Sequence, residues 1–144
     1  MPKVRDEIEI SHSPPSAEEY RSLMRSVGFT VFPAAVAAES LKRSCHAVTL
    51  RKDGVLIGMG RIVGDGVCFV EIVDVVVDPV HQGKGLAKIV MDALMSYATT
   101  QLAEGAFVYL SAHVPADRLY AHYGFEATAP DAVGMCYRVG SAPT

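Results

Sequence analysis

The sequence of 144 residues predicts a mixed α/β fold, with a central and mostly antiparallel sheet of six to seven strands flanked by about four helices. This fold is predicted from the spacing of apolar residues along the chain. In some segments they recur every three or four residues, as in helices, and in others every two residues, as in strands. Glycine- and proline-containing turns separate these segments. No repeat, low-complexity tract or long linker interrupts them, so residues 1–144 are expected to form a single domain.

Local patterns place each element. Ser16 and Glu19 form a capping box before an amphipathic run, and Gly28 fits the end of that helix. The apolar character of residues 72–77 on both sides suggests a central strand that is covered on both faces. The predicted elements are, in order, a strand over 4–10, a helix from Ser16 to Gly28, a helix over about 34–44, strands from His46 to a turn at 52–54, over 55–63 and over 67–77, a helix over about 84–103, a strand over 107–111, a helix over about 116–122, and strands over 125–128 and 134–139.

Composition excludes several classes of protein. A net charge of −3 without a cluster of Lys or Arg argues against nucleic-acid binding, which needs concentrated positive charge. No apolar run reaches the roughly 18 residues of a membrane span, and the N-terminus lacks the apolar core of a signal peptide. A cytoplasmic protein that does not contact the membrane is therefore expected. The three cysteines match no zinc or redox spacing, and neither do His12, His46 and His122, so no metal site is expected.

The most informative stretch is a glycine-containing turn between a strand and a helix. Gly83 and Gly85 let a bulky anion approach the backbone, and the free amides and the dipole of the helix that follows favour negative charge. Lys84 adds a full positive charge. Such a turn suits a diphosphate. It is neither a Walker A loop nor a dinucleotide-binding fingerprint, because the residues that those motifs require are absent.

Two motifs of the chain belong together. Residues 82–87 read Gln-Gly-Lys-Gly-Leu-Ala after a strand that ends in Val-Asp-Pro, and residues 119–125 read Leu-Tyr-Ala-His-Tyr-Gly-Phe. With these two motifs the chain resembles the GNAT family of N-acetyltransferases, because the first fits the family signature Gln/Arg-x-x-Gly-x-Gly/Ala and the second resembles the family's later Phe-Tyr-x-x-x-Gly-Phe segment. The resemblance covers about residues 20–139. Residues 74–79, with the late Gly134-Met135 pair, also resemble the serotonin (aralkylamine) acetyltransferase-like branch.

The resemblance implies a direct transfer from acetyl-CoA, used as a cosubstrate without a metal, to an amine. It assigns the pantetheine arm to the backbone of Val75 and Val77, and Tyr120 to the role of proton donor to the leaving thiolate. The residues assigned to the pyrophosphate are Gln82, Gly83, Lys84, Gly85, Leu86 and Ala87.

The general base is left open among three residues. Glu71 and Asp74 stand three apart on one strand, so they face opposite sides if the pleat is regular. Both line one cleft only if a bulge intervenes, as it often does in this family. The alternative for each is a structural carboxylate. His113 is a second candidate base, since the asparagine that many members have near this point is missing; it could equally be a polar surface residue.

The acceptor is expected to be a small primary amine such as an aryl-alkylamine, because Phe29, Phe32 and Tyr137 would line an aromatic cleft if they are not core residues. The alternatives are an aminoglycoside, an amino acid or a protein lysine as acceptor, or a non-catalytic CoA-binding regulatory domain. A homodimer is common in the family, although no residue pattern here requires one.

Overall fold

The computed structural model describes residues 7–113 and 115–140. The chain divides between Leu110 and Ser111 into two compact units. The first unit holds one sheet of five strands and helices α1 to α3, and the second holds helix α4 (Asp117–Ala121). The described residues thus form the predicted mixed α/β fold with four helices.

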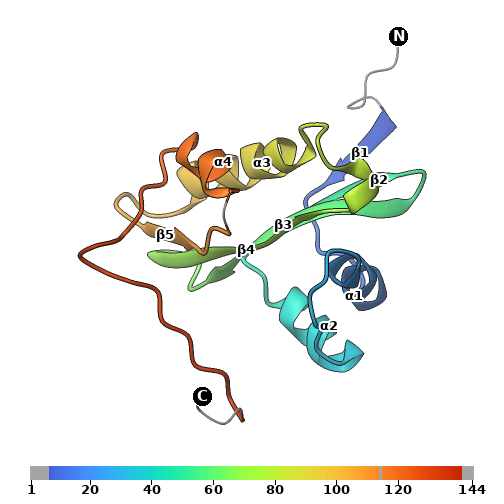
Figure 1. The fold of residues 1–144 in the computed structure, drawn as a ribbon, viewed down its shortest axis with the longest axis horizontal. Helices are drawn as coiled ribbons and strands as arrows, with labels where there is room; N and C mark the ends of the chain where they lie inside the picture. Colours follow the sequence, from blue (N-terminus) through green and yellow to red (C-terminus); the bar gives the residue numbers. More distant parts are fainter. Residues whose placement is uncertain (1–6, 114, 141–144) are drawn as a thin grey trace. The chain divides into compact units, whose positions relative to one another are not determined.

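The strands lie in the sheet in the order in which they occur in the chain. Neighbouring strands are antiparallel, except that β4 and β5 run parallel. Parallel neighbours need a long crossover connection, and helix α3 supplies it (Figure 1). The strands are β1 (Ile8–Ser11), β2 (His46–Lys52), β3 (Val55–Gly64), β4 (Phe69–Val77) and β5 (Phe107–Leu110).

Helices cover both faces of the sheet in the first unit (Figure 1). Helices α1 (Ala17–Ser26) and α2 (Ala34–Lys42) cover one face, where Tyr20, Leu23 and Leu41 pack with Met59 and Val76 of the strands. Helix α3 (Leu86–Gln101) covers the other face, and there Val90 and Leu94 are fully buried. The capping box at the start of α1 is confirmed, since the Ser16 hydroxyl accepts from the Glu19 amide and the Glu19 carboxylate accepts from the Ser16 amide.

The sheet has five strands, not the six to seven that were predicted, because the described residues 125–140 form no strand. The alternating side chains that indicated a strand over 134–139 are all exposed: Met135 by 93%, Tyr137 by 78% and Val139 by 95%. A strand requires a hydrogen-bonded neighbour. Without a neighbour, alternation alone does not define a strand.

Strand β4 begins two residues later than predicted. The Asp65 carboxylate accepts hydrogen bonds from the amides of Val67, Cys68 and Phe69, at 2.7, 2.8 and 3.1 Å. A carboxylate that holds several successive amides makes a compact turn. The turn between β3 and β4 therefore takes up Val67 and Cys68.

Candidate active site

The glycine turn lies between the end of β4 and the start of α3, as predicted. Gly83 and Gly85 both have left-handed backbones, with φ of 79° and 81°, and a Cβ atom at either position would meet nothing within 4 Å. Lys84 between them is exposed. The Gln82 side-chain amide donates to the Val77 carbonyl at 3.0 Å and so ties the turn to the end of the strand.

The N-terminus of α3 is open to an anion. Gly85 occupies the N-cap and has no side chain to accept from the first amides, in contrast to the capped start of α1. The first turn of α3 contains no acidic residue. Uncapped amides, the positive end of the helix dipole and Lys84 together suit a phosphate or diphosphate group.

Strand β4 has a free edge next to this turn. Its pairing with β5 ends at Ile72 opposite Leu110, whereas its pairing with β3 continues to Val77. Residues 73–77 therefore have only one strand partner among the described strands. The Asp78 amide donates to the Ile57 carbonyl of β3 at 2.8 Å, so alternation along the strand turns the backbone groups of Val77 toward the free edge.

A bulge interrupts β4 at Asp74. Arg61 pairs with Val73 and Met59 with Val76, so Gly60 alone lies opposite both Asp74 and Val75. Asp74 has a φ of 57°, a left-handed conformation that aspartate tolerates better than most side chains. Of the two arrangements left open by the sequence, the regular pleat is excluded and the bulge is present.

The carboxylate of Asp74 is held by two side chains. Its Oδ2 atom accepts from Arg61 Nε at 2.8 Å and from the Tyr20 hydroxyl at 3.0 Å. The other guanidinium nitrogens of Arg61 donate to Ser40 and Ser44 of the α2 segment. Burial, followed by the charge of Asp74, raises the pKa of Tyr20 to about 12. This network matches the alternative in which Asp74 is a structural carboxylate and not the general base.

The bulge brings Glu71 to the same face as Asp74. Directly paired residues share a face of a sheet, and Val73 is paired with Arg61, whose side chain reaches Asp74 on the α1 and α2 side. Glu71, two residues before Val73, points to this side as well. Its side chain is exposed, unlike that of Asp74.

Three of the predicted site residues belong to the second unit. Tyr120 lies in α4, is half-buried, and contacts the Phe125 ring edge-on with the centroids 6.3 Å apart. Burial raises the pKa of the Tyr120 phenol, which keeps it protonated. His113 is exposed before α4, and Tyr137 is exposed in the extended segment.

The aromatic residues predicted for an acceptor cleft are not core residues. Phe29 and Phe32, in the loop between α1 and α2, are exposed by 45% and 62%. The loop is held by Arg21, whose Nε donates to the Phe32 carbonyl at 2.9 Å. Of the neighbouring apolar residues, Val31 packs against the core.

Sequence reasoning missed the partners of Asp74. Tyr20 and Arg61 are not among the site residues that the sequence predicts. Arg61 carries the clearer signal, because a single charge in the otherwise apolar strand β3 needs a buried counter-ion. Asp74 is likewise a charged residue in a largely apolar strand, and it too needs a partner.

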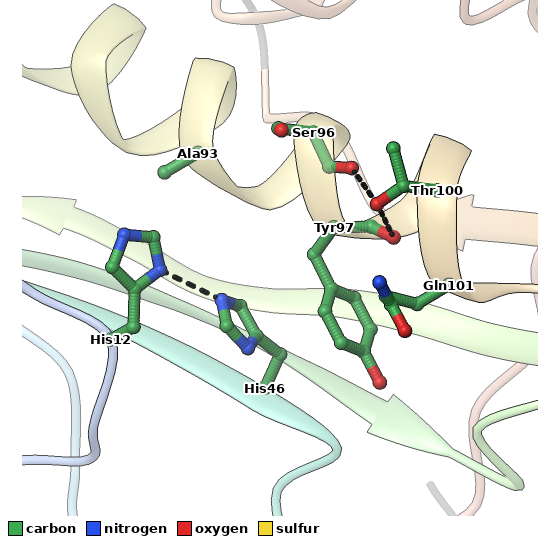
Figure 2. Close-up of a pocket in the computed structure, with 7 residues that line it drawn as sticks. All are labelled: His12, His46, Ala93, Ser96, Tyr97, Thr100 and Gln101. Carbon is green, nitrogen blue, oxygen red and sulfur yellow. Dashed lines mark hydrogen bonds between the residues drawn. The ribbon is translucent and has the colours of Figure 1, made fainter.

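A separate pocket of about 270 Å³ lies along the C-terminal half of α3 (Figure 2). The glycine turn lies at the other end of this helix. His12 Nδ1 and His46 Nε2 are 3.0 Å apart at its wall, and the His46 ring stacks on Tyr97 with centroids 4.3 Å apart. The two histidine centroids are 5.2 Å apart, so the facing nitrogens meet almost head-on in a hydrogen bond in which one ring donates and the other accepts. No group of three or more potential metal ligands occurs in the described part of the chain.

Comparison with known proteins places these features in a family. The sequence model of the acetyltransferase (GNAT) family matches residues 7–125. A probable acetyltransferase of unknown function from methicillin-resistant Staphylococcus aureus is 34% identical, with a TM-score of 0.86 over 91% of this chain and 98% of that one. A GNAT family protein from Streptococcus pneumoniae is 23% identical, with a TM-score of 0.75 over 93% of this chain and 99% of that one, and shows the same fold.

A more distant fold relative is the N-acetylglutamate synthase of Neisseria gonorrhoeae, solved with coenzyme A and L-arginine. It is 15% identical, with a TM-score of 0.67 over 89% of this chain and 29% of that one. No match was found among curated proteins. None of these three relatives is named for an aralkylamine acceptor, so the narrower resemblance stays a prediction. No helix in the described residues is both long and apolar enough to cross a membrane.

Proposed function

The chain belongs to the acetyltransferase (GNAT) family, whose members depend on acetyl-CoA, and we propose that it transfers the acetyl group directly to a small primary amine of the aryl-alkylamine class. The observation that carries the acetyl-CoA part of the proposal is the open start of α3 beside the free edge of β4. The exposed rings of Phe29 and Phe32 support an aromatic amine as acceptor. A diphosphate fits the first feature and an extended amide-containing arm fits the second.

The residues proposed to hold acetyl-CoA are those of the turn and the strand edge. The amides around Gly83 and Gly85 would bind the pyrophosphate, with Lys84 as counter-charge and Gln82 fixing the turn on the strand. Leu86 and Ala87 continue into the first helical turn. The Val77 N–H and the backbone of Val75 would pair with the pantetheine arm, as one more strand pairs with a sheet edge.

The chain's own residues would then move two protons. An ammonium ion must lose a proton before its nitrogen attacks the thioester carbon, and the thiolate gains a proton as the C–S bond breaks and the C–N bond forms. We assign the first role to Glu71, because its side chain is exposed, whereas the Asp74 Oδ2 already accepts from Arg61 and Tyr20. His113 is the other candidate base. Tyr120 is the proposed donor to the thiolate, and its raised pKa supports a protonated phenol.

The first experiment measures turnover and CoA binding together. Release of CoA thiol is followed with acetyl-CoA and aryl-alkylamines, polyamines, aminoglycosides, amino acids and a lysine peptide. Since Cys68 and Cys136 are exposed thiols, each trace needs a blank that contains protein alone, and mass spectrometry should confirm the acetylated amine. Preference for aryl-alkylamines supports the proposal. CoA binding without turnover on any amine favours the non-catalytic alternative, and absence of CoA binding contradicts the whole assignment.

Replacement of Gly85 by Glu tests where the cofactor binds. A carboxylate at the N-cap of α3 would lie on the phosphate path, so CoA affinity should fall by at least tenfold. Gly105→Glu is the matched control, because Gly105 also has a left-handed φ, 85°, and open space around its Cβ position. Equal CoA affinity in the two variants would remove the turn from the cofactor site.

The proton donor is tested by Tyr120→Phe. Loss of a donor that acts only in the transition state should lower kcat by about 10²- to 10⁴-fold while CoA affinity stays the same. Tyr123→Phe provides a control in the same segment. Unchanged kcat in Tyr120→Phe would exclude this role.

A further inference from the structure

Three aromatic side chains form a row on the exposed face of the β4–β5 pair. The rings of Phe69 and Phe107 stack across the two strands with centroids 5.4 Å apart, and Phe107 stacks on Tyr109 along β5 at 6.0 Å. Their exposed fractions are 56%, 54% and 47%. We call these three residues the aromatic row.

Glu71 belongs to the same surface. In the parallel register Phe69 lies beside Phe107 and Glu71 beside Tyr109. Residues two apart on a strand share a face, so Glu71 stands next to Phe69 on β4 and opposite Tyr109 on β5. The surface therefore combines exposed ring faces with one carboxylate.

The row runs toward the point where the two strands part. The last residue pair of β4 and β5 is Ile72 with Leu110, and Glu71 with Tyr109 is the pair before it. Phe69 and Phe107 lie two residues further back, roughly 6.6 Å at about 3.3 Å per residue. Glu71 thus lies two residues before the free edge of β4, whereas Asp74, on the edge itself, is already held by Arg61 and Tyr20.

On the basis of the function proposed above, we propose that this surface binds an aryl-alkylammonium ion, with its ring on Phe69 and Phe107 and its ammonium group beside Glu71 and Tyr109. Ring faces carry negative electrostatic potential and attract cations, and Glu71 adds a full negative charge, so the surface is complementary to a cation with an aromatic body. Two residues of strand between the apolar end and the acidic end match a short alkyl arm. This arrangement would hold the amine at the end of the row where the acyl group is expected.

The proposal is tested by ligand binding, which does not depend on turnover. Affinity for phenethylammonium and for n-butylammonium is measured by NMR titration of CoA-loaded protein, for the wild type and for Phe107→Leu. Leucine keeps an apolar strand residue but removes the ring. We expect the affinity for phenethylammonium to fall about 3- to 10-fold and that for n-butylammonium to change less than twofold. Phe32→Leu, in the loop between α1 and α2, is the comparison, because that loop is the other expected aromatic surface.

Two results would overturn the proposal. One is a wild type that binds both ammonium ions equally. The other is a Phe107→Leu variant that keeps the preference for the aryl compound; if that variant also sediments as a smaller species than the wild type, the row is a contact between copies of the chain. Failure of the transferase function is recognised separately, as aryl-selective binding without release of CoA thiol.

Discussion

Removal of the Arg61 charge should destabilise the fold strongly, because it leaves Asp74 buried without its partner. The side chains of Arg61 and Asp74 are only 10% and 16% exposed, and their ion pair is 2.8 Å long. Breaking such a buried pair from one side costs about 3–5 kcal/mol. For a chain of this length, at roughly 3 °C per kcal/mol, Arg61→Met should lower Tm by about 9–15 °C.

A matched ion pair on the surface provides the control. Arg43 and Glu39 are as close, at 2.7 Å, but their side chains are 77% and 54% exposed. Arg43→Met should therefore cost only about 0.3–0.5 kcal/mol, the usual value for an exposed pair one helical turn apart. Arg43→Met therefore shows what an ion pair contributes when both charges stay solvated. Arg61→Met also removes the hydrogen bonds to Ser40 and Ser44, so its larger cost reports the buried network as a whole.

The second part of the test restores charge balance. Asp74→Asn keeps an acceptor for Arg61 and Tyr20, and asparagine also tolerates the left-handed backbone of this position. In the Arg61→Met background, Asp74→Asn should recover about 1–2 kcal/mol, because no charge is then left unpaired. Urea unfolding followed by circular dichroism measures the wild type, Arg61→Met, Asp74→Asn, the double variant and the Arg43→Met control. A loss below about 1 kcal/mol in Arg61→Met, or strict additivity of the two changes, would refute the reasoning.

Three further outcomes are expected from other parts of the fold. Hydrogen bonding to Arg51 lowers the pKa of Glu19 from 4.5 to about 2. The contribution of the Glu19 carboxylate to stability is therefore present above pH 4.5 and lost toward pH 2, so Glu19→Gln should flatten the acid side of a plot of Tm against pH. An equal effect of Glu18→Gln would contradict this. Burial, followed by the charge of His12, lowers the pKa of His46. The free energy of unfolding should therefore fall as the pH drops below about 6.5. A His46→Asn variant whose stability falls equally steeply with pH would show that His46 is not the cause. Gly60→Ala would place a Cβ atom 2.6 Å from Val90 and should cost about 1–3 kcal/mol in urea unfolding; unchanged stability would mean that α3 shifts freely.

Much of the first unit could be predicted because its signals are local. The capping box at Ser16 needs only residues within one helical turn, and the turn at 52–54 joins two strands that pair directly. The glycine turn also depends on neighbouring residues alone. These features were therefore placed correctly. The first strand, predicted over 4–10, is present from Ile8 to Ser11, and residues 4–6 of that prediction lie outside the described residues.

Features that depend on distant partners could not be fixed in the same way. Whether Glu71 and Asp74 share a face depends on one extra residue in β4 opposite Gly60, and no pattern within β4 reveals it. The alternation of residues 134–139 describes side chains suited to a strand, but a neighbouring strand must be available to form one. The roles of Tyr120, His113 and Glu71 stay predictions, to be tested by the variants above.

The free edge of β4 has a consequence for handling the protein. An unpaired strand edge offers its backbone groups to any other extended chain, and exposed edges of this kind promote aggregation. If the pantetheine arm pairs with residues 73–77, the cosubstrate also shields this edge. Preparations stripped of CoA should then scatter light sooner on heating than preparations that contain it, and adding CoA during purification should raise the yield of soluble protein.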